Sequence, residues 1–313
     1  MAKKILISFM GLLILVILAM WVSYTISVNK LEELTPEVRK NLPGDFITLE
    51  DGVISYYWKG PKNGDIVVLV HGLSTPKFVW DGNIDALTNE GYRVLAFDHF
   101  GRGFSDRPNI NYDQALYIRE LLGLLESFGI NKPVSLVGYS MGGGIVVSFA
   151  AHHPERVKQL ILIAPAGYVP QYSGLASLVL IPGLGDWLMT MVGKKTVMEA
   201  IRKEVKDGTA MPNMVEKFEE QFKYKGYLHS ILSTMRHYPM NDLSEVYEKV
   251  GKLGIPTTAI WGTKDSTVPF EGASKVKAAI PQVKIYPIEG AEHSVTYART
   301  SAVNKILVEV LKK

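Results

Sequence analysis

An uncharged and almost entirely apolar stretch, Ile5–Val28, opens the chain. At about 1.5 Å per residue its 24 residues would form a helix of roughly 36 Å, enough to cross a hydrocarbon core with some tilt. Trp21 and Tyr24 lie near one end, where amphipathic aromatic side chains favour the membrane interface. A buried core helix is rarely apolar on every side, and a signal peptide has an apolar core of only about 7–15 residues. We therefore predict an uncleaved membrane anchor over residues 1–28, with a cleaved signal peptide as the main alternative.

Basic residues flank this stretch on both sides. Two lysines precede it, and Lys30, Arg39 and Lys40 follow it, so the local charge count favours neither orientation. A short basic segment before an N-terminal apolar run is nevertheless typical of export signals. We expect a single-pass protein whose N-terminus is cytoplasmic and whose main domain is on the non-cytoplasmic side. Residues 29–44 are polar, with widely spaced apolar positions, and are predicted to form a juxtamembrane linker.

Beyond residue 44 the chain alternates between short β-branched runs and helical patterns. The segments Phe46–Glu50 and Val53–Trp58 flank Asp51-Gly52, a strong hairpin signal. Continuous apolar runs, typical of strands buried on both faces, recur at Asp65–Val70, Arg93–Phe97, Val134–Val137, Gln159–Ile163, Thr257–Trp261 and Val283–Pro287. Helical patterns lie between or after them at Tyr112–Phe128, Gly143–His152, Glu271–Ile280 and Thr300–Leu311. An opening hairpin followed by this alternation predicts an α/β fold, with a mostly parallel twisted sheet covered by helices on both faces.

One segment interrupts the alternation. Roughly 90 residues between Ala164 and Ile255 contain no good strand pattern. Helical patterns fill this segment at Leu175–Val192, Thr196–Lys206, Pro212–Phe222, Tyr227–Arg236 and Leu243–Leu253. An insertion of that length in a compact domain indicates a subdomain rather than a loop. We predict a helical cap over residues 165–254, inserted into a core of residues 45–164 and 255–313. The cap would lie above the carboxyl ends of the strands, where ligands bind in open α/β sheets.

The composition narrows the possible functions. Hydrophobic residues make up 47% and charged residues 21% of the 313 positions, which is a globular composition. The 34 Lys and Arg residues nearly balance the 31 Asp and Glu residues, so no basic excess indicates nucleic-acid binding. The absence of cysteine excludes thiol nucleophiles, disulfides and cysteine-based metal sites. The histidines lack a metal-binding spacing, and no glycine-rich phosphate loop follows a strand, so we expect neither a metal nor a cofactor.

A nucleophile motif follows the run Val134–Val137. Gly138-Tyr139-Ser140-Met141-Gly142 has the form Gly-x-Ser-x-Gly, and it lies between a predicted strand and a predicted helix. In that context a sharp turn lifts the serine out of the sheet, and side chains at the two glycine positions would collide with the turn. The start of the following helix also favours developing negative charge. We predict that Ser140 is a catalytic nucleophile.

A second motif, His71-Gly72-Leu73, closes the run Asp65–Val70. Here the chain resembles the α/β-hydrolase superfamily, whose members carry His-Gly at the end of this strand. The resemblance implies that the backbone N–H groups of Leu73 and Met141 form an oxyanion hole. We expect His71 to be structural and to hold the loop.

The stretch Asp98–Ser105 resembles the D-x-x-G-x-G-x-S segment of the same superfamily. We interpret it as a scaffold turn rather than as part of the catalytic machinery. Asp98 would satisfy backbone N–H groups or pair with a cation such as Arg102.

Asp265 and His293 complete a predicted triad. Asp265 follows the run Thr257–Trp261, and His293 follows the next predicted strand. The chain order Ser140, Asp265, His293 is the nucleophile–acid–base order of α/β-hydrolases. All three follow strands at the same edge of a parallel sheet and can therefore converge. His293 would take the serine proton, and Asp265 would fix the imidazole tautomer.

The resemblance runs from about Asp45 to Leu311, nearly the whole chain beyond the anchor. It is strongest to membrane-anchored, cap-bearing serine hydrolases of the monoacylglycerol-lipase and carboxylesterase kind. The chain is also similar to meta-cleavage-product hydrolases, which cut carbon–carbon bonds, and to cofactor-free haloperoxidases and perhydrolases. Dehalogenases and epoxide hydrolases use Asp where this chain has Ser140. Several meta-cleavage hydrolases have Asn where this chain has Tyr139, which slightly disfavours that alternative.

The cap contains an unusually apolar segment, Leu175–Gly193, with one charged residue, Asp186. Pro182 and two glycines interrupt it, so it is a poor second membrane span. It would either pack on the core or form an apolar acyl pocket or membrane-dipping lid. We predict that the substrate pocket is lined by Tyr139, Trp187, Met189 and Met191.

These features favour an enzyme that hydrolyses carboxylic esters of a lipid-like kind through an acyl-enzyme on Ser140. The expected partners are a small-molecule ester and the lipid bilayer, and not nucleic acid. A hydrolase fold can also serve as a small-molecule receptor, so a binding protein is the alternative of a different class. The acyl length, the leaving group and the physiological substrate are not encoded in any pattern of this chain.

Overall fold

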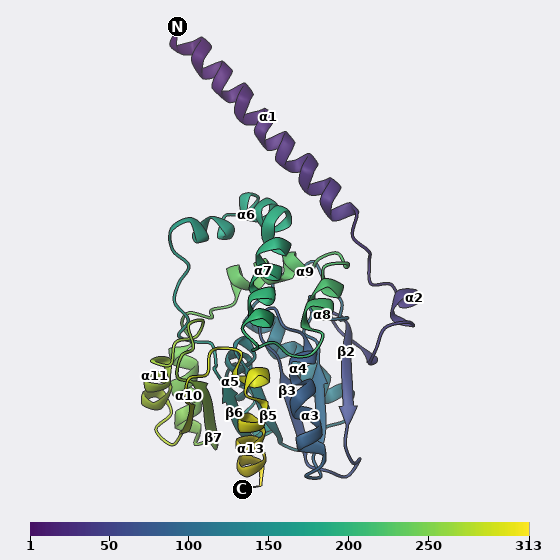
Figure 1. Ribbon diagram of the computed structural model, residues 1–313, viewed down its shortest axis with the longest axis vertical. Coiled ribbons are helices and arrows are strands. Elements are labelled where there is room, and N and C mark those ends of the chain that lie inside the picture. The colour runs from purple at the N-terminus through teal and green to yellow at the C-terminus, as the bar shows by residue number, and fades with distance from the viewer. Residues whose placement is uncertain (313) are drawn as a thin grey trace.

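A computed structural model describes residues 1–312. Its first helix, α1 (Ala2–Asn29), buries none of its residues and extends away from the rest of the chain on the side of the cap (Figure 1). In the described part of the chain, α1 is the single continuous helix that is long and apolar enough to cross a membrane. It coincides with the predicted anchor of residues 1–28.

The following linker lies along the edge of the folded domain. Backbone hydrogen bonds join Glu32 N to Lys223 O (2.9 Å) and Lys225 N to Glu32 O (2.8 Å). The short helix α2 (Pro36–Arg39) follows, and Arg39 forms an ion pair with Asp106 of the core. The linker is therefore attached first to the cap and then to the core.

A sheet of eight strands forms the centre of the domain, in the order β1-β2-β4-β3-β5-β6-β7-β8. Its strands are β1 (Asp45–Leu49), β2 (Gly52–Lys59), β3 (Ile66–Val70), β4 (Arg93–Phe97), β5 (Val134–Tyr139), β6 (Val157–Ile163), β7 (Thr257–Gly262) and β8 (Lys284–Ile288). β1 and β2 form an antiparallel hairpin, and β2 is antiparallel to β4. The pairs from β4 to β8 are parallel. The predicted hairpin and mostly parallel sheet are confirmed.

Helices cover both faces of this sheet (Figure 1). On one face α3 (Asp81–Thr88) packs against α13 (Thr300–Leu311), beside the short α12 (Val295–Ala298). On the other, α5 (Met141–His152) packs against α4 (Gln114–Ser127) and α10 (Ser244–Leu253), and α11 (Gly272–Ala279) packs against α10. Eleven of the twelve residues of α5 are buried, so the helix that follows the nucleophile motif lies within the core.

The cap is inserted where β6 ends. It consists of η3 (Gly174–Leu180), α6 (Leu184–Leu188), η4 (Met189–Gly193), α7 (Lys194–Lys206), α8 (Met214–Gln221) and α9 (Tyr227–His237). Its two ends meet through hydrogen bonds from Gly167 N to Met240 O (2.8 Å) and from Leu243 N to Gly167 O (3.0 Å). We expected the cap to extend to residue 254, but α10 packs on α5 and belongs to the core layer. A helical pattern shows that a helix has an apolar face and does not show what that face contacts.

Candidate active site

Ser140 stands on a sharp turn between β5 and α5. Its backbone has φ 56° and ψ −121°, a conformation that non-glycine residues rarely adopt. A Cβ atom at Gly138 would lie 2.4 Å from Gly142 O, and one at Gly142 would lie 2.2 Å from Val70 O. Glycine is therefore required at both flanking positions, because β5, β3 and α5 approach each other here with no space for a side chain. The turn leaves the Ser140 side chain at the carboxyl edge of the sheet.

His293 and Asp265 reach Ser140 from the loops after β8 and β7. The Ser140 Oγ lies 3.0 Å from His293 Nε2, and His293 Nδ1 lies 2.8 Å from Asp265 Oδ2. Since a carboxylate only accepts hydrogen bonds, Nδ1 carries the proton and Nε2 is left to accept the Ser140 hydroxyl proton. The structure thus brings the three predicted residues into one hydrogen-bonded chain.

The loops themselves hold Asp265 and His293 in place. Asp265 is buried, and its Oδ1 accepts hydrogen bonds from Thr267 N (2.9 Å) and Val268 N (2.8 Å). Lys264 N donates to Ala291 O (2.9 Å), which ties the loop after β7 to the loop after β8. These contacts orient the carboxylate before any substrate arrives.

The loop after β3 passes directly beside the serine. A Cβ atom at Gly72 would lie 3.2 Å from the Ser140 Cβ, so the loop with Leu73 borders the nucleophile. Arg102, which is fully buried, donates from Nε to Leu73 O (2.9 Å) and from Nη2 to Thr234 Oγ1 (2.7 Å) on α9. Arg102 therefore links the loop of the predicted oxyanion hole to the cap.

Met141, the other predicted oxyanion residue, is the first residue of α5 and is buried. The first N–H groups of a helix have no partner within the helix, so a group at this position is available to an anion.

His71 stabilises the same loop. Its Nδ1 donates to Gly72 O (2.8 Å), and its Nε2 accepts from His99 N (2.9 Å). His99 in turn pairs with Glu120, and both side chains are fully buried. Burial lowers the pKa of His99 and raises the pKa of Glu120, so it favours the neutral form of each. These histidines are structural, as the sequence predicted for His71.

Asp98 stabilises the fold and belongs to a different hydrogen-bond network from that of Ser140, His293 and Asp265. It accepts hydrogen bonds from Lys77 N (2.8 Å), Lys77 Nζ (2.6 Å) and Phe104 N (3.1 Å). We expected backbone N–H groups or a cation such as Arg102, and the cation is Lys77, from the helical turn η1 (Lys77–Trp80). Residues 77 and 98 are far apart in the sequence, and only the folded chain brings them together.

Comparison with known proteins assigns the fold family. Residues 65–298 match the family described as alpha/beta hydrolase fold. The chain belongs to this family. The matched segment contains the strand–serine–helix turn and continues past His293.

Two curated relatives with different activities are similarly distant from this hydrolase. A monoacylglycerol lipase (abhd6-B) of Xenopus laevis is 26% identical over 265 residues, which cover 80% of this chain and 76% of that protein. A 2-hydroxy-6-oxononadienedioate/2-hydroxy-6-oxononatrienedioate hydrolase of Burkholderia vietnamiensis is 26% identical over 283 residues, covering 85% of this chain and 94% of that one. The crystal structure of an enol-lactonase from Burkholderia xenovorans LB400 matches 86% of this chain and 100% of its own, with a TM-score of 0.73 and 20% identity. That last likeness shows the fold alone.

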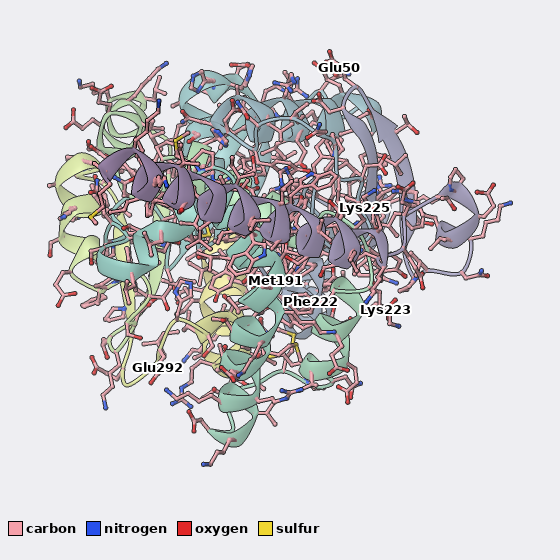
Figure 2. All side chains as sticks on the ribbon, turned by 90° about the horizontal axis from the view of Figure 1, so that it is seen from above. Glu50, Met191, Phe222, Lys223, Lys225 and Glu292 are labelled. Carbon is pink, nitrogen blue, oxygen red and sulfur yellow. The ribbon has the colours of Figure 1, made fainter. Side chains whose placement is uncertain are left out.

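The four residues predicted to line the substrate pocket of this hydrolase lie in different surroundings, and their contact with substrate stays a prediction. Tyr139 is buried, and its hydroxyl donates to His293 O (3.0 Å) while its ring lies 5.3 Å from the imidazole. Trp187 donates from Nε1 to Ser23 Oγ of α1 (2.9 Å). Met189 packs against the hydrophobic core, and Met191 is half-buried on the cap face that α1 crosses (Figure 2). Tyr139 thus supports His293, and Trp187 faces α1.

One acidic residue near the site, Glu204, could not be predicted from a sequence pattern. Tyr297 donates to Glu204 Oε2 (2.8 Å) on the cap helix α7, and its hydroxyl lies close to Tyr139, which contacts His293. Burial raises the pKa of Glu204, while the hydrogen bond from Tyr297 and the charge of His293 act in the opposite direction. Glu204 therefore brings the cap close to His293. In residues 1–312 no group of three or more His, Asp or Glu side chains is arranged to hold a metal ion.

Proposed function

We propose that this hydrolase is a membrane-anchored serine hydrolase that cleaves carboxylic esters, with lipid-like acyl esters such as monoacylglycerols as substrates. The observation that carries the proposal is the hydrogen-bonded chain from Ser140 Oγ through His293 to Asp265, located at a strained turn. A serine and a histidine in this geometry, with a carboxylate on the far side of the ring, form an activated nucleophile.

The reaction would run in two steps, acylation of Ser140 and hydrolysis of the acyl-enzyme. In the first, His293 Nε2 takes the Ser140 hydroxyl proton as Oγ attacks the ester carbonyl carbon. The resulting oxyanion accepts hydrogen bonds from the backbone N–H groups of Leu73 and Met141. The C–O bond then breaks as His293 returns the proton to the leaving alcohol, which leaves an acyl group on Ser140. In the second step water attacks the acyl carbon, His293 takes its proton, and the carboxylic acid departs as Ser140 regains the hydroxyl hydrogen.

Charges near His293 favour a neutral ester over the dicarboxylates named for some relatives. Glu204 accepts a hydrogen bond from Tyr297 near His293, and Glu292 precedes His293 in the chain, so two acidic side chains lie near this histidine. The relative from Burkholderia vietnamiensis is named for a substrate with two carboxylates. Like charges close together are unfavourable, and this disfavours the carbon–carbon bond hydrolase alternative.

A membrane location is consistent with such substrates. α1 has the length and composition of a single span, and it contacts the cap at α6 and η4. We propose that α1 is an uncleaved anchor and that the catalytic domain lies on the non-cytoplasmic side. An enzyme held there would meet esters that partition into the bilayer.

A matched pair of chromogenic esters tests the proposed substrate class. We expect the full chain in detergent to hydrolyse p-nitrophenyl butyrate with a kcat/KM roughly tenfold higher than that for p-nitrophenyl hemisuccinate, because the extra carboxylate meets a like charge worth about 1–2 kcal/mol. The two esters have the same chain length and leaving group. Folded protein that cleaves neither ester would favour a receptor, and cleavage confined to meta-cleavage products would favour the alternative enzyme.

Deleting residues 1–28 tests whether the anchor contributes to chemistry. We expect a soluble, folded domain with kcat/KM for p-nitrophenyl butyrate within about twofold of the full chain, because the hydrogen-bonded triad contains no residue of α1. Sedimentation and turnover of the two proteins provide the comparison. A folded but inactive truncated domain would show that α1 supports the site, and full-length protein in the aqueous fraction would contradict the anchor.

A further inference from the structure

A cavity of about 560 Å³ lies between the C-terminal end of α1, the linker and the cap. Four basic side chains line it: Arg107, Lys194, Lys225 and His229. Figure 2 shows Lys225 beside the C-terminal half of α1, with Phe222 of the same cavity on the cap. This cavity is separate from the catalytic residues, none of which lines it.

Two of these cations lack a carboxylate partner. Lys225 pairs with Glu33 (3.3 Å), and His229 Nδ1 lies 3.6 Å from Asp186. Within residues 1–312, by contrast, no carboxylate lies within ion-pair distance of Arg107 or Lys194. The carboxylates that line the cavity are engaged, because Asp106 pairs with Arg39 of the linker.

Arg107 is also incompletely satisfied as a hydrogen-bond donor. Its terminal nitrogens donate to Ser105 O (3.0 Å) and Gly103 O (2.9 Å), whereas its buried Nε has no partner among the described residues. Burial lowers the pKa of Arg107 to about 10, as expected for a desolvated cation. The Arg107 charge therefore faces neutral carbonyl groups and no carboxylate, which leaves it uncompensated for an anionic ligand.

An apolar groove of about 650 Å³ adjoins the cavity with the basic side chains along α1. One wall is the α1 face from Leu13 to Tyr24, and the other is the cap segment from Pro182 to Trp187. Tyr24 lines both spaces, so the groove and the cavity meet at this residue. The Trp187 hydrogen bond to Ser23 fixes the cap against the helix at the same level.

The order of these features along α1 matches the order of parts in a membrane lipid. The groove follows the apolar middle of the helix, and the cavity follows its C-terminal end and the linker, from Tyr24 to Leu34. Leu13 to Tyr24 spans about 16 Å of helix, roughly half of a hydrocarbon core of about 30 Å and therefore one leaflet.

We propose that an anionic phospholipid of the surrounding leaflet binds between the anchor and the cap, with its phosphate at Arg107 and Lys194 and one acyl chain in the groove. This site rests on the membrane location proposed above and is independent of ester cleavage. A zwitterionic choline lipid fits less well, because its ammonium group would face the same cations. The bound lipid would hold the cap in a fixed position at the membrane surface.

Quenching of Trp187 fluorescence by lipids with brominated acyl chains tests the site directly. The full chain with Trp21→Phe is reconstituted in phosphatidylcholine vesicles that contain brominated phosphatidylglycerol or brominated phosphatidylcholine. Trp187 is then the remaining tryptophan on the groove. We expect brominated phosphatidylglycerol to quench it at a clearly lower mole fraction than brominated phosphatidylcholine does. Equal quenching by both lipids would overturn the proposal.

Lys194→Gln and its neighbour Lys195→Gln form a matched pair. Both lysines are exposed residues of α7, but Lys195 does not line the cavity and lies 3.9 Å from Glu199. Lys194→Gln should weaken the phosphatidylglycerol preference about fivefold, the effect of one cation near an anionic surface, while Lys195→Gln leaves it unchanged. Arg107→Gln should weaken it at least as much, provided that the variant retains its melting temperature.

Two further results bear on the same site. Equal effects of Lys194→Gln and Lys195→Gln would indicate nonspecific surface attraction and would contradict a lipid site. Inorganic phosphate at matched ionic strength should leave the quenching unchanged, and displacement by phosphate would show a site for soluble anions instead. Neither readout uses Ser140, so failure here is distinguishable from failure of the proposed esterase activity.

Discussion

Replacing Ser140 with alanine is expected to reduce ester turnover by roughly 10⁶-fold, to the residual rate that binding and oxyanion stabilisation alone provide. The Ser140 Oγ is the atom that His293 Nε2 contacts at 3.0 Å, and alanine removes it without changing the backbone that Gly138 and Gly142 permit. The variant should therefore fold as the parent does. Turnover of p-nitrophenyl butyrate and the melting temperature of both proteins measure the two effects.

An active-site probe identifies the nucleophile independently. A fluorophosphonate should label the parent at Ser140 and leave Ser140→Ala unlabelled, as peptide mass spectrometry can show. Ser274→Ala provides a matched control, because Ser274 is an exposed serine of α11. Labelling at another serine, or full turnover by Ser140→Ala, would overturn the assignment.

Replacing Asp265 with asparagine is expected to lower kcat by roughly 10³–10⁴-fold with little change in shape. The Asp265 carboxylate accepts the Nδ1 proton of His293 at 2.8 Å and so leaves Nε2 free to act as a base toward Ser140. An amide at this position can donate to Nδ1 and thereby favour the tautomer that carries its proton on Nε2. Steady-state kinetics with p-nitrophenyl butyrate measure the loss.

Asp98→Asn is the matched control for this variant, since Asp98 also follows a strand and is also buried. It should lower stability instead of turnover, by about 3 kcal/mol, because it removes one charge of the buried pair with Lys77. Denaturant unfolding and kcat for both variants separate the roles. If Asp98→Asn lost turnover and Asp265→Asn kept it, the assignment of the triad acid would be reversed.

The triad illustrates what could be predicted without coordinates. Ser140, Asp265 and His293 lie 125 and 28 residues apart, yet each directly follows a strand pattern. In a parallel sheet the carboxyl ends of the strands share one edge, so the positions of the strands were enough to predict that the three side chains meet. The turn at Ser140 was predictable for a similarly local reason, because a Cβ at either neighbouring glycine would collide with backbone.

The surroundings of the triad were less predictable. Tyr139 follows from the motif, but its contact with His293 depends on where the loop after β8 passes. Asp98 was expected to accept backbone N–H groups or to pair with a cation such as Arg102. It accepts backbone N–H groups, and its cation is Lys77, from a different strand connection. Glu204 had no signal, because a glutamate on an amphipathic helix such as α7 is usually exposed.

Sequence alone therefore determined the anchor-length helix, the strand and helix order and the three catalytic candidates. These depend on periodicity, on chain order and on steric limits within a few residues, and all of these can be recognised from short segments of the sequence. Tertiary structure decided that α10 packs on the sheet, that Trp187 faces α1 and that Arg107 and Lys194 share a cavity without a carboxylate partner among residues 1–312. Those facts depend on which surfaces of distant segments pack together, and a pattern of apolar and polar positions shows that a surface is buried without showing which segment covers it.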